Sequence, residues 1–271
     1  MKPLYKYTIL ILTGLTVITA CSKKEDVQPQ TTNKATLSLQ FDNIAGDRNL
    51  QLNTGVYKNA SGEQFTVQLL QYFISNIKVK TKDDREFTVP QDESYFLVKE
   101  SDGTTQFCKV KVPEGDYKTL TFTLGVDSLR NTMDIAKRTG VLDPTGGMDD
   151  GMYWGWNSGY IFFKMEGTSE QAPVDPTGVR KFRFHIGGFG GYSAPTFNNI
   201  KTITVDLSAA GIARVRGGRE SNVHFLVDVM KMFNARTNIS IAANPQVMFS
   251  NYSVNVANNF SSMFYHDHTE N

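Results

Sequence analysis

The stretch Thr36-Leu37-Ser38-Leu39-Gln40-Phe41 alternates apolar and polar residues, and this alternation decides the class of fold. Successive side chains of a β-strand point to opposite faces of a sheet, so the three apolar residues share one face. Similar runs recur along the chain, separated by turn-forming residues such as Pro113-Glu114-Gly115-Asp116. The runs cover residues 73–79, 95–98, 120–126, 160–165, 181–186, 200–207 and 224–229.

Many short strands joined by polar turns predict an all-β, β-sandwich-like fold with Greek-key connections. Two short helices are expected as well, at residues 128–138 and 227–234. No internal repeat and no shift in composition divides residues 35–271. We therefore expect a single domain over residues 35–271, with long irregular loops between its strands.

The composition is that of a globular chain with balanced charge. Its 271 residues include 28 Lys and Arg against 27 Asp and Glu, and 40% of them are hydrophobic. A net charge of +1 argues against a nucleic-acid partner, which would require a basic surface. The hydrophobic share excludes a disordered chain, and two cysteines are too few for a disulfide framework or a cysteine-rich metal site.

Residues 1–20 have the features of a secretion signal. Lys2 and Lys6 precede an apolar stretch at residues 8–20, which is too short to span a membrane as a helix. The stretch ends in Ile18-Thr19-Ala20-Cys21, which resembles a bacterial lipobox. This resemblance implies cleavage before Cys21 and lipidation of its thiol. The alternative is a plain signal peptide followed by a chance cysteine.

A lipid on Cys21 would anchor the chain outside the cytoplasm. Ser22 is not the aspartate that typically retains a lipoprotein at the inner membrane. Lys24-Glu25-Asp26 resembles the export signal of Bacteroidetes surface lipoproteins. We therefore expect an outer-membrane lipoprotein on the periplasmic or the cell-surface face, with residues 21–34 as lipid anchor and flexible linker.

Two glycine-rich stretches, at residues 139–159 and 187–195, interrupt the strand pattern. Long irregular loops in a compact domain are often functional, and the first of these holds both tryptophans. Large aromatic rings indicate either a plug in the core or an exposed platform for glycans or a protein partner. The platform would consist of Tyr153, Trp154, Trp156 and Tyr160.

The four histidines differ in what their neighbours indicate. His185 ends a strand before a glycine-rich loop, and is either a packed edge histidine or a metal ligand. His266 and His268 flank Asp267, so an extended segment would place both rings on one face and offer two imidazoles to one ion. The alternative is a passive chain end. His224 alternates with apolar residues and is expected to be structural.

The sequence gives little support for a calcium site or for catalysis. Asp143, Asp149 and Asp150 lack the ligand spacing of a calcium-binding EF-hand loop, so a solvated turn is expected there. The chain contains no nucleophile elbow, phosphate loop, HExxH or dinucleotide fingerprint. No motif therefore supports an enzyme.

Five blocks of the sequence, read together, resemble the MbnP family of periplasmic or surface copper-binding proteins. They occur in the family's order, and the resemblance as a whole extends over roughly residues 36–268. The WxWxSGY block is long and unusual, which makes the resemblance specific. The blocks are QYFISNI (71–77), GVDS (125–128), LDP (142–144), GMYWGWNSGY (151–160) and FHIGG (184–188).

The resemblance implies that a partner enzyme of the diheme cytochrome c peroxidase type oxidises one tryptophan to kynurenine. The aryl amine of kynurenine would then join two histidines around copper, as Cu(I) or Cu(II). An amine can coordinate copper, whereas an intact indole has no free lone pair in the plane of its ring. On this chain the resemblance places the modification at Trp154 or Trp156, and the ligands at His185 and at His268 or His266.

The expected function is copper acquisition or storage without catalysis, with a TonB-dependent outer-membrane transporter as a further partner. Gly188-Phe189-Gly190-Gly191 departs from the Ser-Thr-Gly-Cys segment that methanotroph members have after this strand. Two alternatives stay open at this point. One is a non-metal surface binding module that uses the aromatic platform, and the other is a structural accessory lipoprotein.

Overall fold

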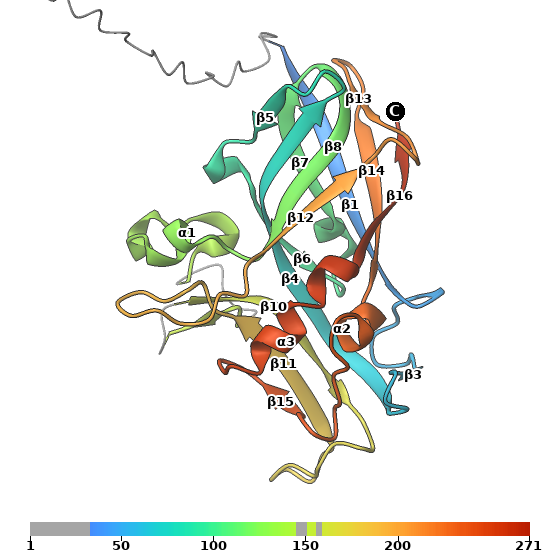
Figure 1. Cartoon of the computed structure of the whole chain (residues 1–271), viewed down its shortest axis with the longest axis vertical. Helices are drawn as coiled ribbons and strands as arrows, with labels where there is room; N and C mark the ends of the chain where they lie inside the picture. Colours follow the sequence, from blue (N-terminus) through green and yellow to red (C-terminus); the bar gives the residue numbers. More distant parts are fainter. Residues whose placement is uncertain (1–32, 145–150, 156–158) are drawn as a thin grey trace, which may run out of the picture.

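The computed structural model describes residues 33–144, 151–155 and 159–271. In this part of the chain, strands predominate and the α-helices are short, as Figure 1 shows. The expectation of an all-β, sandwich-like fold is therefore confirmed. None of the helices within the described ranges is long and apolar enough to cross a membrane.

A five-stranded sheet forms one layer of the molecule. Its strand order is β16-β14-β1-β2, and β7 also pairs with β1. β1 and β14 are parallel, whereas β14 and β16 are antiparallel, so β16 is an edge strand next to β14. The strands are β1 (Lys34–Ala45), β2 (Arg48–Asn49), β7 (Phe107–Pro113), β14 (Ser221–Asp228) and β16 (Phe264–Glu270).

An eleven-stranded sheet forms the second layer, in the order β12-β8-β4-β10-β11-β15. Five shorter strands join this path, with β13 pairing with β8, β9 with β10, and β3, β5 and β6 with β4. The path strands are β4 (Gln64–Thr81), β8 (Gly115–Leu124), β10 (Gly159–Thr168), β11 (Lys181–Gly187), β12 (Lys201–Asp206) and β15 (Gln246–Val247). The shorter strands are β3 (Tyr57–Lys58), β5 (Glu86–Thr88), β6 (Tyr95–Lys99), β9 (Tyr153–Trp154) and β13 (Ala213–Val215).

The helices are shorter than the sequence pattern suggests. The first one expected, at residues 128–138, forms only α1 (Ser128–Thr132), because Asp134 caps a separate 3₁₀ turn after it. The second, at residues 227–234, begins later as α2 (Met230–Asn234), since residues 227–228 still belong to β14. α3 (Ser253–Ala257) was not anticipated from the sequence.

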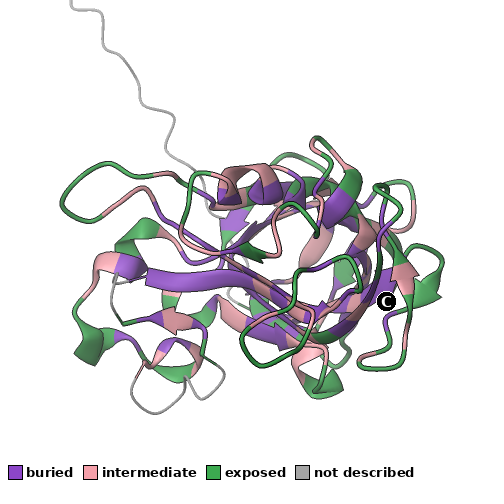
Figure 2. Cartoon of the chain, turned by 90° about the horizontal axis from the view of Figure 1, so that it is seen from below, coloured by how far each residue is buried: buried purple, intermediate pink, exposed green. Residues whose placement is uncertain are grey.

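The main core lies between the two sheets and is rich in phenylalanine. Phe41 of β1 stacks on Phe225 of β14 at a centroid distance of 5.4 Å. Phe122 of the other sheet meets Phe41 edge-on, also at 5.4 Å. Figure 2 shows the buried segments running through the middle of the molecule, with exposed loops around them. The inner faces of β1 and β14 are thus packed against the other sheet, and their outer faces are left for polar side chains.

A second, smaller core covers the opposite face of the eleven-stranded sheet. Tyr72 and Phe73 are neighbours on β4, yet Tyr72 belongs to the main core and Phe73 to the second one. This division follows from the alternation of side chains along a strand. Trp154 and Tyr160 are also part of the second core. The tryptophan-containing hairpin is therefore packed against the sheet.

Candidate metal centre

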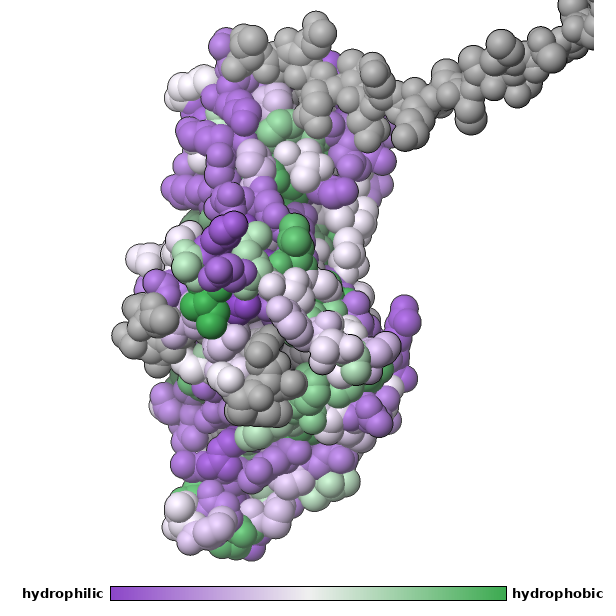
Figure 3. Space-filling model, turned by 90° about the vertical axis from the view of Figure 1, so that its left-hand side faces the viewer, coloured by the Kyte–Doolittle hydropathy of each residue, from purple (hydrophilic) through white to green (hydrophobic). Residues whose placement is uncertain are grey.

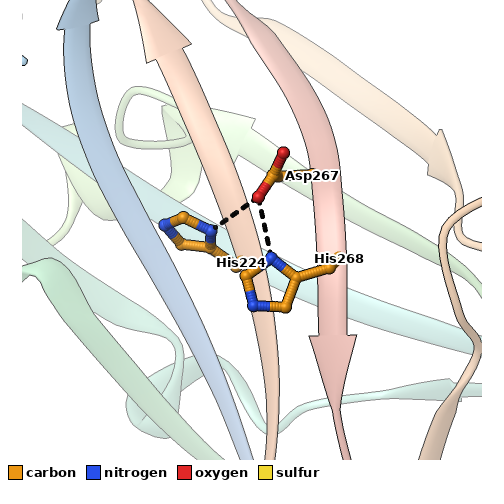
Figure 4. A group of neighbouring side chains, drawn as sticks. All are labelled: His224, Asp267 and His268. Atoms are coloured by element: carbon orange, nitrogen blue, oxygen red, sulfur yellow. Dashed lines mark hydrogen bonds and ion pairs between the residues drawn. The ribbon is translucent and has the colours of Figure 1, made fainter.

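His224, Asp267 and His268 meet on the outer face of the five-stranded sheet, where β14 pairs with β16 (Figure 4). Oδ2 of Asp267 lies 2.7 Å from Nδ1 of His268 and 3.2 Å from Nδ1 of His224. One donor atom of each residue lies within 4.8 Å of the other two. The group thus combines two imidazoles and one carboxylate at a spacing that suits a single metal ion.

An extra residue in β16 brings Asp267 and His268 to the same face. His224 pairs with His268, but the next residue, Phe225, pairs with His266, so Asp267 is inserted into the ladder. Such a β-bulge sets two consecutive side chains opposite one residue of the neighbouring strand. Asp267 and His268 can therefore both face His224, which strict alternation would not allow.

The same bulge turns His266 away from the group. The expectation that His266 and His268 share a face is wrong, because the inserted Asp267 breaks the alternation between them. The His266 ring lies 6.1 Å from the buried Phe225 ring, and its Nε2 is 2.9 Å from Oγ1 of Thr269. His266 therefore contributes to the packing of β16 and not to this group of donors.

Burial lowers the pKa of His266 below its ordinary value of 6.5. The unfolded chain then binds a proton at His266 at a higher pH than the folded chain does. The stability tied to neutral His266 is present above about pH 6.5 and is lost as the pH falls below it. We expect the wild type to lose more unfolding free energy than His266→Gln between about pH 7 and pH 5, measured by urea unfolding. Equal losses in the two proteins would contradict a half-buried, neutral His266.

Charge and exposure make the group accessible to a cation. The hydrogen bond between His268 and Asp267 raises the pKa of His268 and lowers the pKa of Asp267. A metal ion in place of the shared proton would gain from the same carboxylate. The side chains of His268 and Asp267 are 47% and 42% exposed, whereas that of His224 is only 13% exposed. His224 thus ties the group to the sheet, and the other two face solvent.

His185 lies on β11 in the other sheet and is not part of this group. Its Nε2 is 2.7 Å from Oε1 of Glu166 on β10, and Nζ of Lys164 is 3.8 Å from the same oxygen. The hydrogen bond from His185 lowers the pKa of Glu166. β11 and β16 occupy different parts of the molecule (Figure 1), so the structure brings His268 to His224 and not to His185.

Trp154 packs beside the end of β11. A Cβ atom at Gly187 would lie 2.7 Å from the indole ring, so this position must be glycine for the ring to fit. Gly187 and His185 are two residues apart on one strand, and Trp154 therefore covers the face of β11 that bears His185. The indole also meets Phe249 edge-on at a centroid distance of 5.7 Å. Trp154 and His185 thus lie on the same side of β11, and neither belongs to the group of His224, Asp267 and His268, which is called the β16 group below.

The aromatic residues considered as a binding platform are mostly buried. Tyr160 is fully buried and Trp154 is 7% exposed, because both fill the second core. Tyr153 meets Tyr160 at 64°, and the Arg138 guanidinium lies over both rings. On the side of the molecule shown in Figure 3, polar and apolar side chains are mixed. The three described members of the platform do not form an exposed, coplanar stack.

Four of the residues considered as sites lie outside the described part of the chain: Cys21, Asp149, Asp150 and Trp156. Their roles stay predictions. Asp143 is described, and its backbone N–H donates to the carbonyl of Gly140 at 3.1 Å. This hydrogen bond closes a 3₁₀ turn, which agrees with the turn expected around Asp143.

Two of the five sequence blocks build a network that supports the tryptophan hairpin. Asn76 donates to Oδ2 of Asp127 at 3.2 Å, and Asp127 caps α1 by accepting from the Arg130 backbone N–H. Asn131 of α1 in turn accepts from the backbone N–H of Tyr160 at 3.0 Å. We conclude that these residues are structural, because they connect β4, α1 and β10 through satisfied hydrogen bonds.

A family model described as MbnP matches residues 34–249 of the chain. The chain belongs to the MbnP family. A solved structure, MbnP from Methylosinus trichosporium, is similar to it with a TM-score of 0.54 at 14% sequence identity. The similarity covers 81% of this chain and 82% of that one, which confirms the fold. No curated protein matches the sequence.

Membership of the MbnP family confirms the resemblance seen in the five sequence blocks, and it suggests a methanobactin-associated, copper-related function. The MbnP match ends at residue 249, before Asp267 and His268. The β16 group thus lies partly beyond the residues that define the family here. Sequence reasoning found His268 but missed His224 as its partner. The sequence did carry one signal for His224, because the alternation of β14 places it on the polar face of its strand.

Proposed function

We propose that this member of the MbnP family binds copper, and that His224, Asp267 and His268 are the ligands. The observation that supports this proposal is the convergence of their three donor atoms within 4.8 Å of one another. Imidazole nitrogen and carboxylate oxygen are both ligands of copper(II), which binds to such donors more tightly than the other divalent first-row metals do. The residues present thus fit the metal that family membership suggests.

The surroundings of His185 fit copper less well. They contain one imidazole, and Lys164 places an ammonium group 3.8 Å from the Glu166 carboxylate. A neighbouring ammonium group opposes the binding of another cation. We therefore keep His268 as a ligand and replace His185 by His224 as its partner.

Further features of the proposal come from the sequence. Lipidation of Cys21 would hold the chain at the outer membrane, on its periplasmic or cell-surface face. A diheme cytochrome c peroxidase-like enzyme would oxidise Trp154 or Trp156 to kynurenine, and an aryl amine at Trp154 would lie on the His185 side of the molecule. A TonB-dependent transporter would be the partner in copper uptake, and the chain itself would catalyse no reaction.

A copper(II) titration of the purified protein tests this proposal. We expect about one tightly bound copper per chain, because the two imidazoles and the carboxylate surround one position. The variant His185→Ala serves as the control and should bind the same amount. A protein that binds no copper, or loses it only in His185→Ala, would contradict the proposed ligands. Peptide mass analysis of protein from its native host tests Trp154 and Trp156 for kynurenine.

A further inference from the structure

Each histidine of the metal centre has a second carboxylate near its other ring nitrogen. Nε2 of His224 lies 3.6 Å from Oδ2 of Asp42, and Nε2 of His268 lies 3.7 Å from Oε1 of Glu270. Both Nδ1 atoms face Asp267 instead. The two rings are thus oriented alike, with Nδ1 toward the shared carboxylate and Nε2 toward an outer one.

The strands determine where these outer carboxylates lie. Asp42 is two residues beyond Gln40 on β1, and Gln40 pairs with His224. Asn222 of β14 donates to Gln40 at 2.8 Å and to Glu270 at 3.4 Å, which links the side chains of three neighbouring strands. The outer carboxylates therefore belong to the polar face of the sheet and are not part of a mobile loop.

We infer that Asp42 and Glu270 are positioning residues that direct His224 and His268 to bind a divalent cation through Nδ1. This inference rests on the proposed function of the same group. Without a metal ion, both Nδ1 atoms are hydrogen-bonded to Asp267, and the outer carboxylates lie at ion-pair distance from Nε2. An ion that replaces the proton at Nδ1 leaves the single N–H of a neutral imidazole on Nε2, where the outer carboxylate stabilises it. Any proton on Nδ1 is released to solvent when the ion binds.

Charge and donor type favour a divalent ion over copper(I). With neutral histidines, the carboxylates of Asp42, Asp267 and Glu270 bring three negative charges to this face. A divalent ion neutralises more of that charge than a monovalent one does. The donor set contains no thiolate, the type of ligand that selects copper(I). Copper(II) and zinc(II) are therefore suitable probes.

Zinc(II) is diamagnetic, so the ligating nitrogen can be identified by NMR. Long-range ¹H–¹⁵N correlation spectra of the zinc-loaded chain should show both histidines bound through Nδ1, with the proton on Nε2. A spectrum that shows ligation through Nε2 would overturn this inference and leave the proposed function intact. No zinc or copper binding by the wild type would overturn both.

The variant Asp42→Asn tests the positioning role separately. We expect its affinity for zinc(II) and copper(II) to fall about 10- to 100-fold with unchanged stoichiometry, as is typical when an outer partner of a ligand is lost. Asp47→Asn is the matched control, because it removes the same charge from a side chain that is 94% exposed. Equal affinities of the two variants would contradict the role of Asp42.

Discussion

Replacing His268 with alanine should lower the affinity of the chain for copper(II) by roughly 100-fold or more, about 3 kcal/mol of binding free energy. The variant loses one of the three donors that converge on the outer face of β14 and β16. Because the His268 side chain is 47% exposed, its removal should leave the stability of the fold nearly unchanged. A competition titration with a chelator of known affinity measures the effect.

Two matched variants make the test specific. His224→Ala should lower the affinity to a similar extent, since its Nδ1 faces the same carboxylate oxygen. His185→Ala removes an imidazole from the other sheet and should leave the affinity unchanged. Retention of tight copper binding in both His268→Ala and His224→Ala would show that the ion binds elsewhere.

Replacing Phe264 with alanine should destabilise the fold by about 3–5 kcal/mol, which is typical of a large aromatic side chain lost from a core. Phe264 begins β16 and is 7% exposed. Its ring meets Phe122 at 5.3 Å and Phe41 and Tyr72 at 6.1 Å, so it connects the edge strand to both sheets. Urea unfolding measures the loss.

The neighbouring residue provides the control for this variant. Tyr265 follows Phe264 on β16 but is 44% exposed, so Tyr265→Ala should cost no more than about 1 kcal/mol. A loss below about 1 kcal/mol in Phe264→Ala would contradict its role in anchoring β16.

Copper should also protect β16 from hydrogen exchange, because an ion held by β14 and β16 stabilises the strand pair that binds it.

The strands of the fold could be predicted from the sequence because alternation directly reports burial on one face. Residues 36–41 show this clearly, and the observed β1 buries Leu37, Leu39 and Phe41 as expected. The strand order could not be predicted, because alternation does not say which strands pair. The parallel pairing of β1 with β14, which are far apart in the sequence, is one example.

The candidate metal centre could be predicted only in part from the sequence, for the same reason. His268 was expected to be a ligand, but its partner His224 is identified only by the pairing of β14 with β16. The spacing of His266 and His268 predicted a common face, and the bulge at Asp267 reversed it. A bulge of one residue cannot be recognised from the alternation of residues in a sequence.

The resemblance to MbnP identified the family but not the position of the β16 group. The sequence blocks that support the resemblance include Asn76 and Asp127, which form structural hydrogen bonds. Asn76 and Asp127 lie within the residues matched by the family model, whereas Asp267 and His268 lie after them. Family membership and the convergence of His224, Asp267 and His268 are therefore separate observations, and both are consistent with copper.

The most direct test of the copper site is a crystal structure of the copper-loaded protein with anomalous diffraction data at the copper edge. We predict a single strong peak about 2 Å from Nδ1 of His224, Nδ1 of His268 and Oδ2 of Asp267. A peak beside His185 and Trp154, with none between β14 and β16, would contradict the proposed copper site.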